Sequence, residues 1–242
     1  MPLSKPLLSV IVPVWREADK IEDALKNLYS ATEEVSYEII VVDGDYEGST
    51  LKVIEPFLQS TNASILVPTH CVISEKGRGN QMNCGAKKAI APFLLFLHVD
   101  TKLPPRALEK ILFKLNQSNE IVAGAFDLAI ESPQWIFTVI SKISSWRSRI
   151  TRIPYGDQGI FIRREIFEAV GGFENIPIME DVTLMRLLKK QNMKICFLSD
   201  PVSTSARRWE RDGIVQCTLR NWCLITLYFC GVKPQVLSRF YK

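Results

Sequence analysis

The chain has 242 residues, of which 47% are hydrophobic and 23% are charged, so it can bury a sizeable core and is not a disordered polypeptide. Its 30 Lys and Arg against 26 Asp and Glu give a balance that suits a phosphate-bearing ligand and is too weakly basic for a nucleic-acid-binding protein. The six cysteines form no Cys-x-x-Cys pair, and the N-terminus lacks a signal-peptide pattern, so we expect a reduced, cytoplasmic protein.

Apolar, β-branched runs alternate with helical segments through the first half of the chain. Strands are expected at Leu8–Val14, Glu38–Val42, Ala63–Val67 and Phe93–Leu97. Helices are expected after Asp19, at Leu51–Leu58 and at Gly79–Ala89. This alternation predicts right-handed crossovers, so the fold class is α/β, with a mostly parallel central sheet flanked by helices.

The pattern changes after Asp100. Further helices are expected after Pro104-Pro105, at Pro133–Trp146, from Arg164 to Gly171 and at Asp181–Lys190. Further strands are expected at Val122–Ile130, which alternates like an antiparallel or edge strand, at Gly159–Ile162 and at Lys194–Leu198. No internal repeat or long linker divides the chain, so we expect a single domain over residues 1–242.

An uncharged run near the C-terminus, Asn221–Val232, is about half the roughly 20 residues that a membrane span needs. We expect a buried helix there. Trp222, Tyr228 and Phe229 lie between Arg220 and Lys233, so a peripheral contact with a membrane, at the inner membrane face, stays open as an alternative. The sequence also leaves open whether the chain forms a homodimer.

Acidic residues follow three of the expected parallel strands. Glu17, Asp43 and Asp100 come directly after the first, second and fourth of these strands. The carboxyl ends of parallel strands share one edge of a sheet, where ligands gather. Three carboxylates at that edge predict a site for a cation, a base or a sugar, although each acid taken singly could be an ordinary turn residue.

The segments around these acids resemble family 2 glycosyltransferases of the GT-A fold, including small soluble bacterial-type members. The resemblance is carried, in the family's order, by seven blocks: Ser9–Glu17, Glu38–Gly44, Gly77–Asn83, Phe96–Thr101, Gly156–Gly159, Met179–Asp181 and Ser205–Trp209. It implies a nucleotide-binding half at residues 1–101 and an acceptor and catalytic half at residues 102–242. It also implies a nucleotide-sugar donor and a saccharide or lipid-linked acceptor.

For the nucleotide, the resemblance implies that Pro13, Val14, Glu17 and Val99 line the base and ribose. Asp43 would accept a hydrogen bond from the imide N–H of uracil, which makes a UDP-sugar the expected donor. Arg78, next to a glycine at an expected helix start, would bind a phosphate, and a solvated surface arginine is the alternative.

For the metal, the resemblance implies that Asp100 holds Mg²⁺ or Mn²⁺ together with diphosphate oxygens. The chain departs from the family's Asp-x-Asp element, because His98 stands at the first position. It also lacks the usual adjacent acidic pair after the second strand, where the sequence continues Asp43-Gly44-Asp45.

For catalysis, the resemblance implies that Asp181, preceded by Glu180, is the general base of an inverting transfer. A plain helix N-cap is the alternative for Asp181. The remaining implied contacts are with sugar or acceptor hydroxyls and with the leaving diphosphate, through Gly156, Asp157, Gln158, Arg207, Arg208 and Trp209. A solvated basic turn with a half-buried tryptophan is the alternative for the last three.

Three other functions compete with a glycosyltransferase. A nucleotidyltransferase needs a glycine-rich basic loop after the first strand, and the segment Pro13–Glu17 contains no glycine. A dehydrogenase fails for the same reason. A non-catalytic sugar-nucleotide-binding protein is the remaining alternative, against which Asp100, Glu180 and Asp181 argue.

Overall fold

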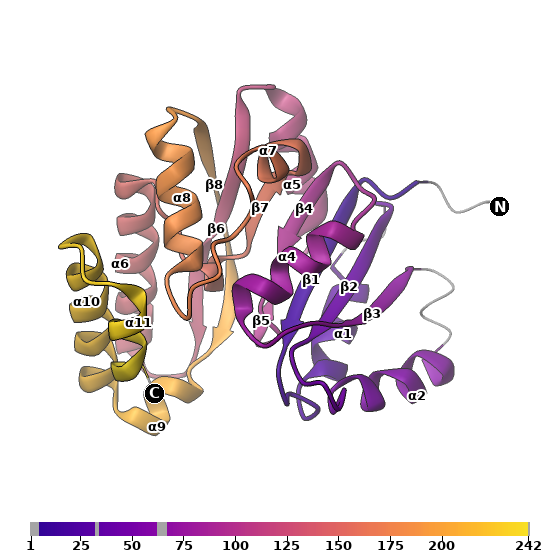
Figure 1. Cartoon of the computed structure of the whole chain (residues 1–242), viewed down its shortest axis with the longest axis horizontal. Helices are drawn as coiled ribbons and strands as arrows, with labels where there is room; N and C mark the ends of the chain where they lie inside the picture. The colour runs from indigo at the N-terminus through magenta and orange to yellow at the C-terminus, as the bar shows by residue number, and fades with distance from the viewer. Residues whose placement is uncertain (1–4, 32–33, 62–66, 242) are drawn as a thin grey trace.

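A mixed sheet runs through the computed structural model, which describes residues 5–31, 34–61 and 67–241. In this part of the chain the sheet has eight strands in the order β3-β2-β1-β4-β7-β6-β8-β5 (Figure 1). The strands are β1 (Leu8–Val14), β2 (Tyr37–Asp43), β3 (Thr69–Ile73), β4 (Phe93–Phe96), β5 (Thr101–Lys102), β6 (Ile121–Glu131), β7 (Ile160–Arg163) and β8 (Lys194–Ser205). Only β7 and β5 run against the others, which confirms the mostly parallel α/β sheet.

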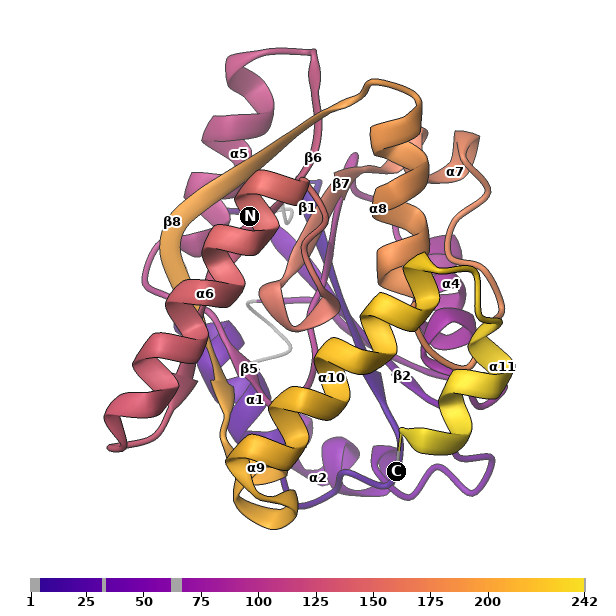
Figure 2. The same ribbon diagram turned by 90° about the vertical axis from the view of Figure 1, so that its left-hand side faces the viewer.

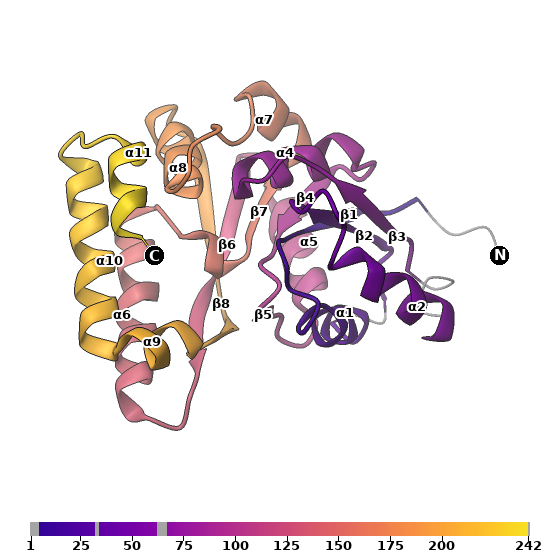
Figure 3. The ribbon, with the colours of Figure 1, turned by 60° about the horizontal axis from the view of Figure 1, so that its bottom comes forward.

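Helices cover both faces of this sheet. They are α1 (Ile21–Tyr29), α2 (Leu51–Thr61), α4 (Arg78–Lys88), α5 (Ala107–Gln117), α6 (Trp135–Thr151), α7 (Arg164–Ala169), α8 (Glu180–Lys190), α9 (Arg207–Asp212), α10 (Ile214–Phe229) and α11 (Pro234–Leu237). Side chains of α1, α2 and α5 share one apolar cluster, and those of α4, α7 and α8 share another. Figure 3 shows these two layers on either side of the strands.

Strand β1 shows why the central strands lack a polar face. Val10 and Val12 pack into the first cluster, whereas Ile11 packs into the second. Helix α4 lies very close to this strand, since a Cβ on Gly85 would stand 2.5 Å from Cγ2 of Ile11. A strand buried on both faces is apolar throughout, which is the pattern that the sequence shows.

Two sequence-based expectations need correction, and a third lies mostly outside the described residues. The strand expected at residues 63–67 falls mostly outside the described residues, and the third strand begins at Thr69. Strand β6 is antiparallel to β7 but is not an edge strand, because β8 pairs along its other side. The buried helix expected near the C-terminus is wrong: only Cys217 and Leu224 of α10 are buried.

Candidate functional site

The carboxyl ends of β1, β2 and β4 meet at one edge of the sheet. Val14 lies opposite Asp43, and Ile11 lies opposite Phe96, so these parallel strands end close together. The turn after β4 is closed by a hydrogen bond of 3.0 Å from the N–H of Thr101 to the carbonyl oxygen of His98. The loops that carry Glu17, Asp43 and Asp100 therefore share this edge, as the sequence predicts.

His98, Gly156 and Asp181 converge at that edge from three different elements. The N–H of Gly156 donates a 2.5 Å hydrogen bond to Oδ2 of Asp181. A Cβ on Gly156 would lie 3.0 Å from Nε2 of His98 and 3.2 Å from Oδ2 of Asp181. The short 3₁₀ turn Gly156–Gln158, which precedes β7, thus lies against the start of α8 and the loop after β4. A larger side chain at Gly156 would require His98 or Asp181 to shift.

Arg78 and Glu180 form an ion pair between the starts of α4 and α8. The two helix starts lie close together, because a Cβ on Gly79 would stand 3.7 Å from Cβ of Glu180. Burial by itself would lower the pKa of the Arg78 guanidinium, but Glu180 and Asp181 raise it above its ordinary value. Burial raises the pKa of the Glu180 carboxyl, and Arg78 opposes that shift.

Asp157 lies beside this pair, and one of its carboxyl oxygens accepts no hydrogen bond from the described residues. Burial, followed by the charge of Asp181, raises the pKa of Asp157 to about 6. Its Oδ1 is buried and has no hydrogen-bond partner among the described residues. The pKa of His98 is lowered to about 3, first by burial and then by Arg78 and Arg208, so its imidazole is neutral near pH 7.

Arg207 and Arg208 of α9 are both exposed, and Arg208 acts on this cluster from the surface. Arg208 donates a hydrogen bond to the hydroxyl of Tyr241 and is close enough to act on the charges of His98 and Asp157. The ring of Trp209 packs edge-on against Phe137 of α6 at a centroid distance of 6.0 Å. Trp209 is therefore half-buried, as in the alternative of a basic turn with a half-buried tryptophan. Stacking of Trp209 on a sugar stays a prediction.

The predicted nucleotide-binding residues lie along the ends of β1, β2 and β4. Pro13, Val14 and Val99 are buried, and Glu17 pairs with Lys20 at 2.9 Å. Asp43 is fully buried, and its carboxylate accepts hydrogen bonds from the backbone N–H groups of its own turn, at Asp45 (2.9 Å) and Thr50 (3.1 Å). Its predicted bond to a uracil ring would have to be made in addition to these two.

Gln158 holds three elements together. Its amide nitrogen donates to the carbonyl oxygen of Phe126 (2.9 Å), and its oxygen accepts from the hydroxyl of Ser148 (2.6 Å) and the N–H of Tyr155 (3.1 Å). The side chain is 1% exposed. Its predicted contact with a sugar hydroxyl stays a prediction, and the second N–H of its amide is the group left to make it.

The sequence analysis missed Arg147 and Tyr241. The Arg147 guanidinium lies 3.4 Å from the centre of the Tyr155 ring, and the charges of Asp157 and Asp181 act on it. Burial lowers the pKa of Arg147, and these acids oppose the shift. Neither residue lies in a block that resembles the family, and no local pattern in the sequence marks them.

A metal ion would depend on Asp100 and on the ligand. In the described ranges, no three His, Cys, Asp or Glu side chains are grouped so that they could hold a metal. The partly exposed Asp100 carboxylate makes no hydrogen bond or ion pair with another described residue. One free carboxylate, completed by diphosphate oxygens and water, fits Mg²⁺ or Mn²⁺.

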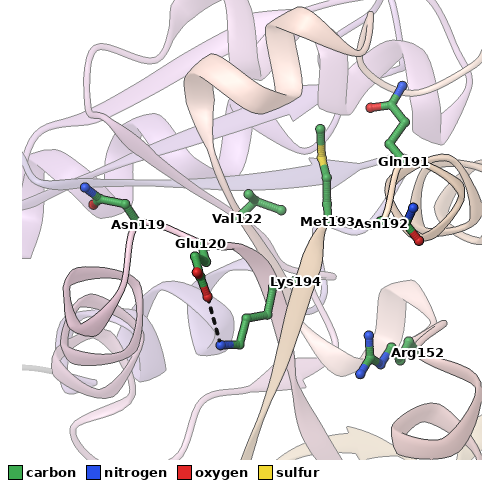
Figure 4. A pocket seen from close by; sticks show the side chains of 8 residues that line it. All are labelled: Asn119, Glu120, Val122, Arg152, Gln191, Asn192, Met193 and Lys194. Carbon is green, nitrogen blue, oxygen red and sulfur yellow. Dashed lines mark hydrogen bonds and ion pairs between the residues drawn. The ribbon is translucent and has the colours of Figure 1, made fainter.

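A separate hollow of about 490 Å³ lies at the amino ends of β6 and β8 (Figure 4). It is bordered by Asn119, Glu120, Arg152 and Lys194, and an ion pair of 3.3 Å joins Lys194 to Glu120. The amino ends of these strands are opposite the edge where Asp181 and His98 meet. This hollow contains none of the predicted site residues.

Comparisons with known proteins agree with the fold. The chain is 24% identical over 196 residues to a dolichol-phosphate mannosyltransferase of Pyrococcus furiosus, covering 78% of this chain and 54% of that protein. It is 24% identical to an uncharacterized glycosyltransferase of Haemophilus influenzae, covering 86% and 71%. The chain thus spans about half the length of the Pyrococcus relative.

Solved structures show the same architecture. A mannosyltransferase of Pyrobaculum calidifontis in complex with GDP-Man and Mn²⁺ superposes with a TM-score of 0.62 at 19% identity, covering 84% of this chain and 57% of that one. TarS of S. aureus in complex with UDP-GlcNAc superposes with a TM-score of 0.61 at 19% identity, covering 82% and 58%. The family described as glycosyl transferase family 2 matches residues 9–173. The chain therefore has the GT-A fold and belongs to glycosyl transferase family 2.

Proposed function

We propose that this chain is an inverting glycosyltransferase that moves a sugar from a nucleotide-diphosphate donor to a hydroxyl of a saccharide or lipid-linked acceptor. The observation that carries the proposal is the approach of Gly156 to both the Asp181 carboxylate and His98 at the carboxyl edge of the sheet. The structures in complex with GDP-Man and with UDP-GlcNAc support a nucleotide-diphosphate sugar as the donor class. A UDP-sugar is our first candidate, with residues 1–101 as the nucleotide-binding half.

Asp181 is the proposed general base. It would take the proton of the acceptor hydroxyl while that oxygen attacks the anomeric carbon from the face opposite the leaving group. Its Oδ1 accepts from the N–H of Val182 (2.7 Å) and its Oδ2 from the N–H of Gly156. A carboxylate has about four lone-pair positions, so both oxygens keep capacity for a hydroxyl. Glu180 supports this carboxylate by holding Arg78 beside it.

Cationic side chains are available for the leaving diphosphate. Arg78 and Arg208 would stabilise the charge that develops on it, and the exposed Arg207 would add to the same field. Asp100 would hold Mg²⁺ or Mn²⁺, and a bound cation supplies further neutralisation of the diphosphate. The unpartnered Oδ1 of Asp157 would accept a hydrogen bond from a sugar or acceptor hydroxyl.

Asp181→Asn tests the base. We expect transfer and donor hydrolysis to fall at least about a hundredfold, within the range ascribed to general bases, while the affinity for the nucleotide diphosphate stays unchanged. Asp23→Asn is the matched control, since the Asp23 side chain is 82% exposed on α1. Full transfer activity of Asp181→Asn would refute the role of Asp181.

Donor turnover distinguishes the alternatives. A transferase incubated with a UDP-sugar or GDP-mannose and Mn²⁺ should slowly release free nucleotide diphosphate. A non-catalytic sugar-nucleotide-binding protein would bind the donor and release none, and a nucleotidyltransferase would release a nucleoside triphosphate when given pyrophosphate. A thermal-shift comparison of UDP with GDP would identify the base.

A further inference from the structure

Helix α6 carries apolar side chains away from the core as well as toward it, and serines line much of the side that faces β6. Its inward stripe is formed by Phe137, Ser141, Ser145 and Ser148, which are buried. Ser145 accepts the backbone N–H of Leu128 (2.9 Å), and Ser141 accepts that of Ile130 (3.1 Å), so these serines satisfy β6.

The outward stripe of the same helix is apolar. It consists of Trp135, Val139, Ile143, Trp146 and Ile150, at the helical spacing of three or four residues. Trp135 is 74% exposed and Trp146 is 67% exposed. A surface helix ordinarily turns its apolar stripe toward the core. This stripe is exposed to solvent instead, although side chains of its kind are ordinarily buried.

Helix α10 repeats the arrangement. Val215, Leu219, Trp222 and Phe229 lie on the side opposite the buried Cys217 and Leu224, and each of the four is at least half exposed. Figure 2 shows α6 and α10 on the same side of the molecule, facing the viewer. We call the two outward stripes together the apolar face.

The two chain segments that carry the apolar face hold charges of one sign. Helices α6 and α10 lie within residues 132–156 and 213–242. These two segments hold eight of the chain's 30 Lys and Arg and no Asp or Glu. Lys142, Arg152, Lys233 and Arg239 are exposed. The acids that reach these helices are paired, Asp127 with Arg149 at 3.0 Å and Asp212 with Arg220 at 2.7 Å.

We propose that the apolar face docks on an anionic lipid bilayer. Tryptophans and aliphatic side chains would enter the boundary between headgroups and acyl chains, while the exposed Lys and Arg meet the lipid phosphates. A symmetric pair of copies would instead bring two basic faces together, so the charge favours the bilayer over a homodimer. No helix in the described part of the chain is long and apolar enough to cross a membrane, so the docking is peripheral.

Docking would place the carboxylate cluster near the lipid. Arg147, which acts on the charges of Asp157 and Asp181, directly follows the outward-facing Trp146 on α6. Tyr228 of α10 shares a hydrogen bond of 2.7 Å with Thr183, two residues after Asp181. Both docking helices therefore border the site. The carboxylate cluster would lie about one helix diameter, roughly 10 Å, from the lipid surface.

Vesicle flotation tests the proposal. The full chain should float with vesicles of equal parts phosphatidylcholine and phosphatidylglycerol, and less with phosphatidylcholine alone or at high salt. The double variant Trp146→Ser/Trp222→Ser should bind at least about tenfold more weakly, because two tryptophans no longer enter the interface. Lys142→Glu/Lys233→Glu should lose the preference for anionic vesicles.

Phe113→Ser is the matched control, because Phe113 on α5 is as exposed as Trp146, at 67%, and lies outside the apolar face. It should bind vesicles like the wild type, and circular dichroism melting should be the same for all variants. Failure of the wild type to float with anionic vesicles would overturn the proposal, as would an equal loss in Phe113→Ser. So would a dimer in light scattering that the double tryptophan variant converts to monomers while vesicle binding is absent.

Discussion

The Asp157 carboxyl should cost the folded chain stability at neutral pH. Its pKa is raised from 3.8 to about 6, first by burial and then by Asp181. One pKa unit corresponds to about 1.4 kcal/mol, so the penalty at pH 7 is at most about 3 kcal/mol. Replacement by asparagine keeps the shape and removes the charge. We therefore expect Asp157→Asn to be more stable than the wild type at pH 7, by about 1 to 3 kcal/mol.

The pH dependence gives the sign of this effect. Between about pH 4 and pH 6 the folded chain holds a proton on Asp157 that the unfolded chain has released. The free energy of unfolding of the wild type therefore falls as the pH rises through this window, and the penalty is fully present above it. The stability gain of Asp157→Asn should vanish near pH 4 and reach its full size above about pH 6.

Urea unfolding of both proteins, followed by circular dichroism across this range, measures the difference. Asp23→Asn is the control again and should give a small difference that does not change with pH. If Asp157→Asn were no more stable than the wild type at pH 7, or if its gain were as large at pH 4, the carboxyl would not be destabilised by burial and by Asp181, and the electrostatic description of the cluster would be wrong.

Three further variants test the packing of the site. Gly156→Ala should reduce donor turnover about a hundredfold with little change in the melting temperature, because its methyl group would push Asp181 away from His98. Gln158→Ala should lower the free energy of unfolding by about 2 to 4 kcal/mol in urea titrations, since it leaves buried partners unsatisfied. Trp209→Phe should lower this free energy by no more than about 1 to 2 kcal/mol, the cost of the smaller ring, because the buried N–H that it removes has no partner among the described residues. A loss of several kcal/mol for Trp209→Phe would mean that the indole N–H is bonded.

Local sequence patterns determined the elements and their order. The apolar runs of β1, β2 and β4 are typical of strands buried on both faces. The acids that follow them indicated which edge of the sheet would hold the site. The order of the short blocks placed Asp100 and Asp181 in a family pattern. These signals are local, because strand periodicity, helix starts and turns depend on residues a few positions apart.

Tertiary structure alone decided which side chains share the site and which way the helices face. The contact of Gly156 with His98 and Asp181 joins segments far apart in the chain, and Arg147 enters the site from a helix with no motif. Helix α6 was recognisable as amphipathic, but a period of 3.6 residues is the same whether the apolar stripe points inward or outward. The backbone N–H groups of β6, which have the serines of α6 as acceptors, and the burial of Phe137 together turn that stripe toward the outside.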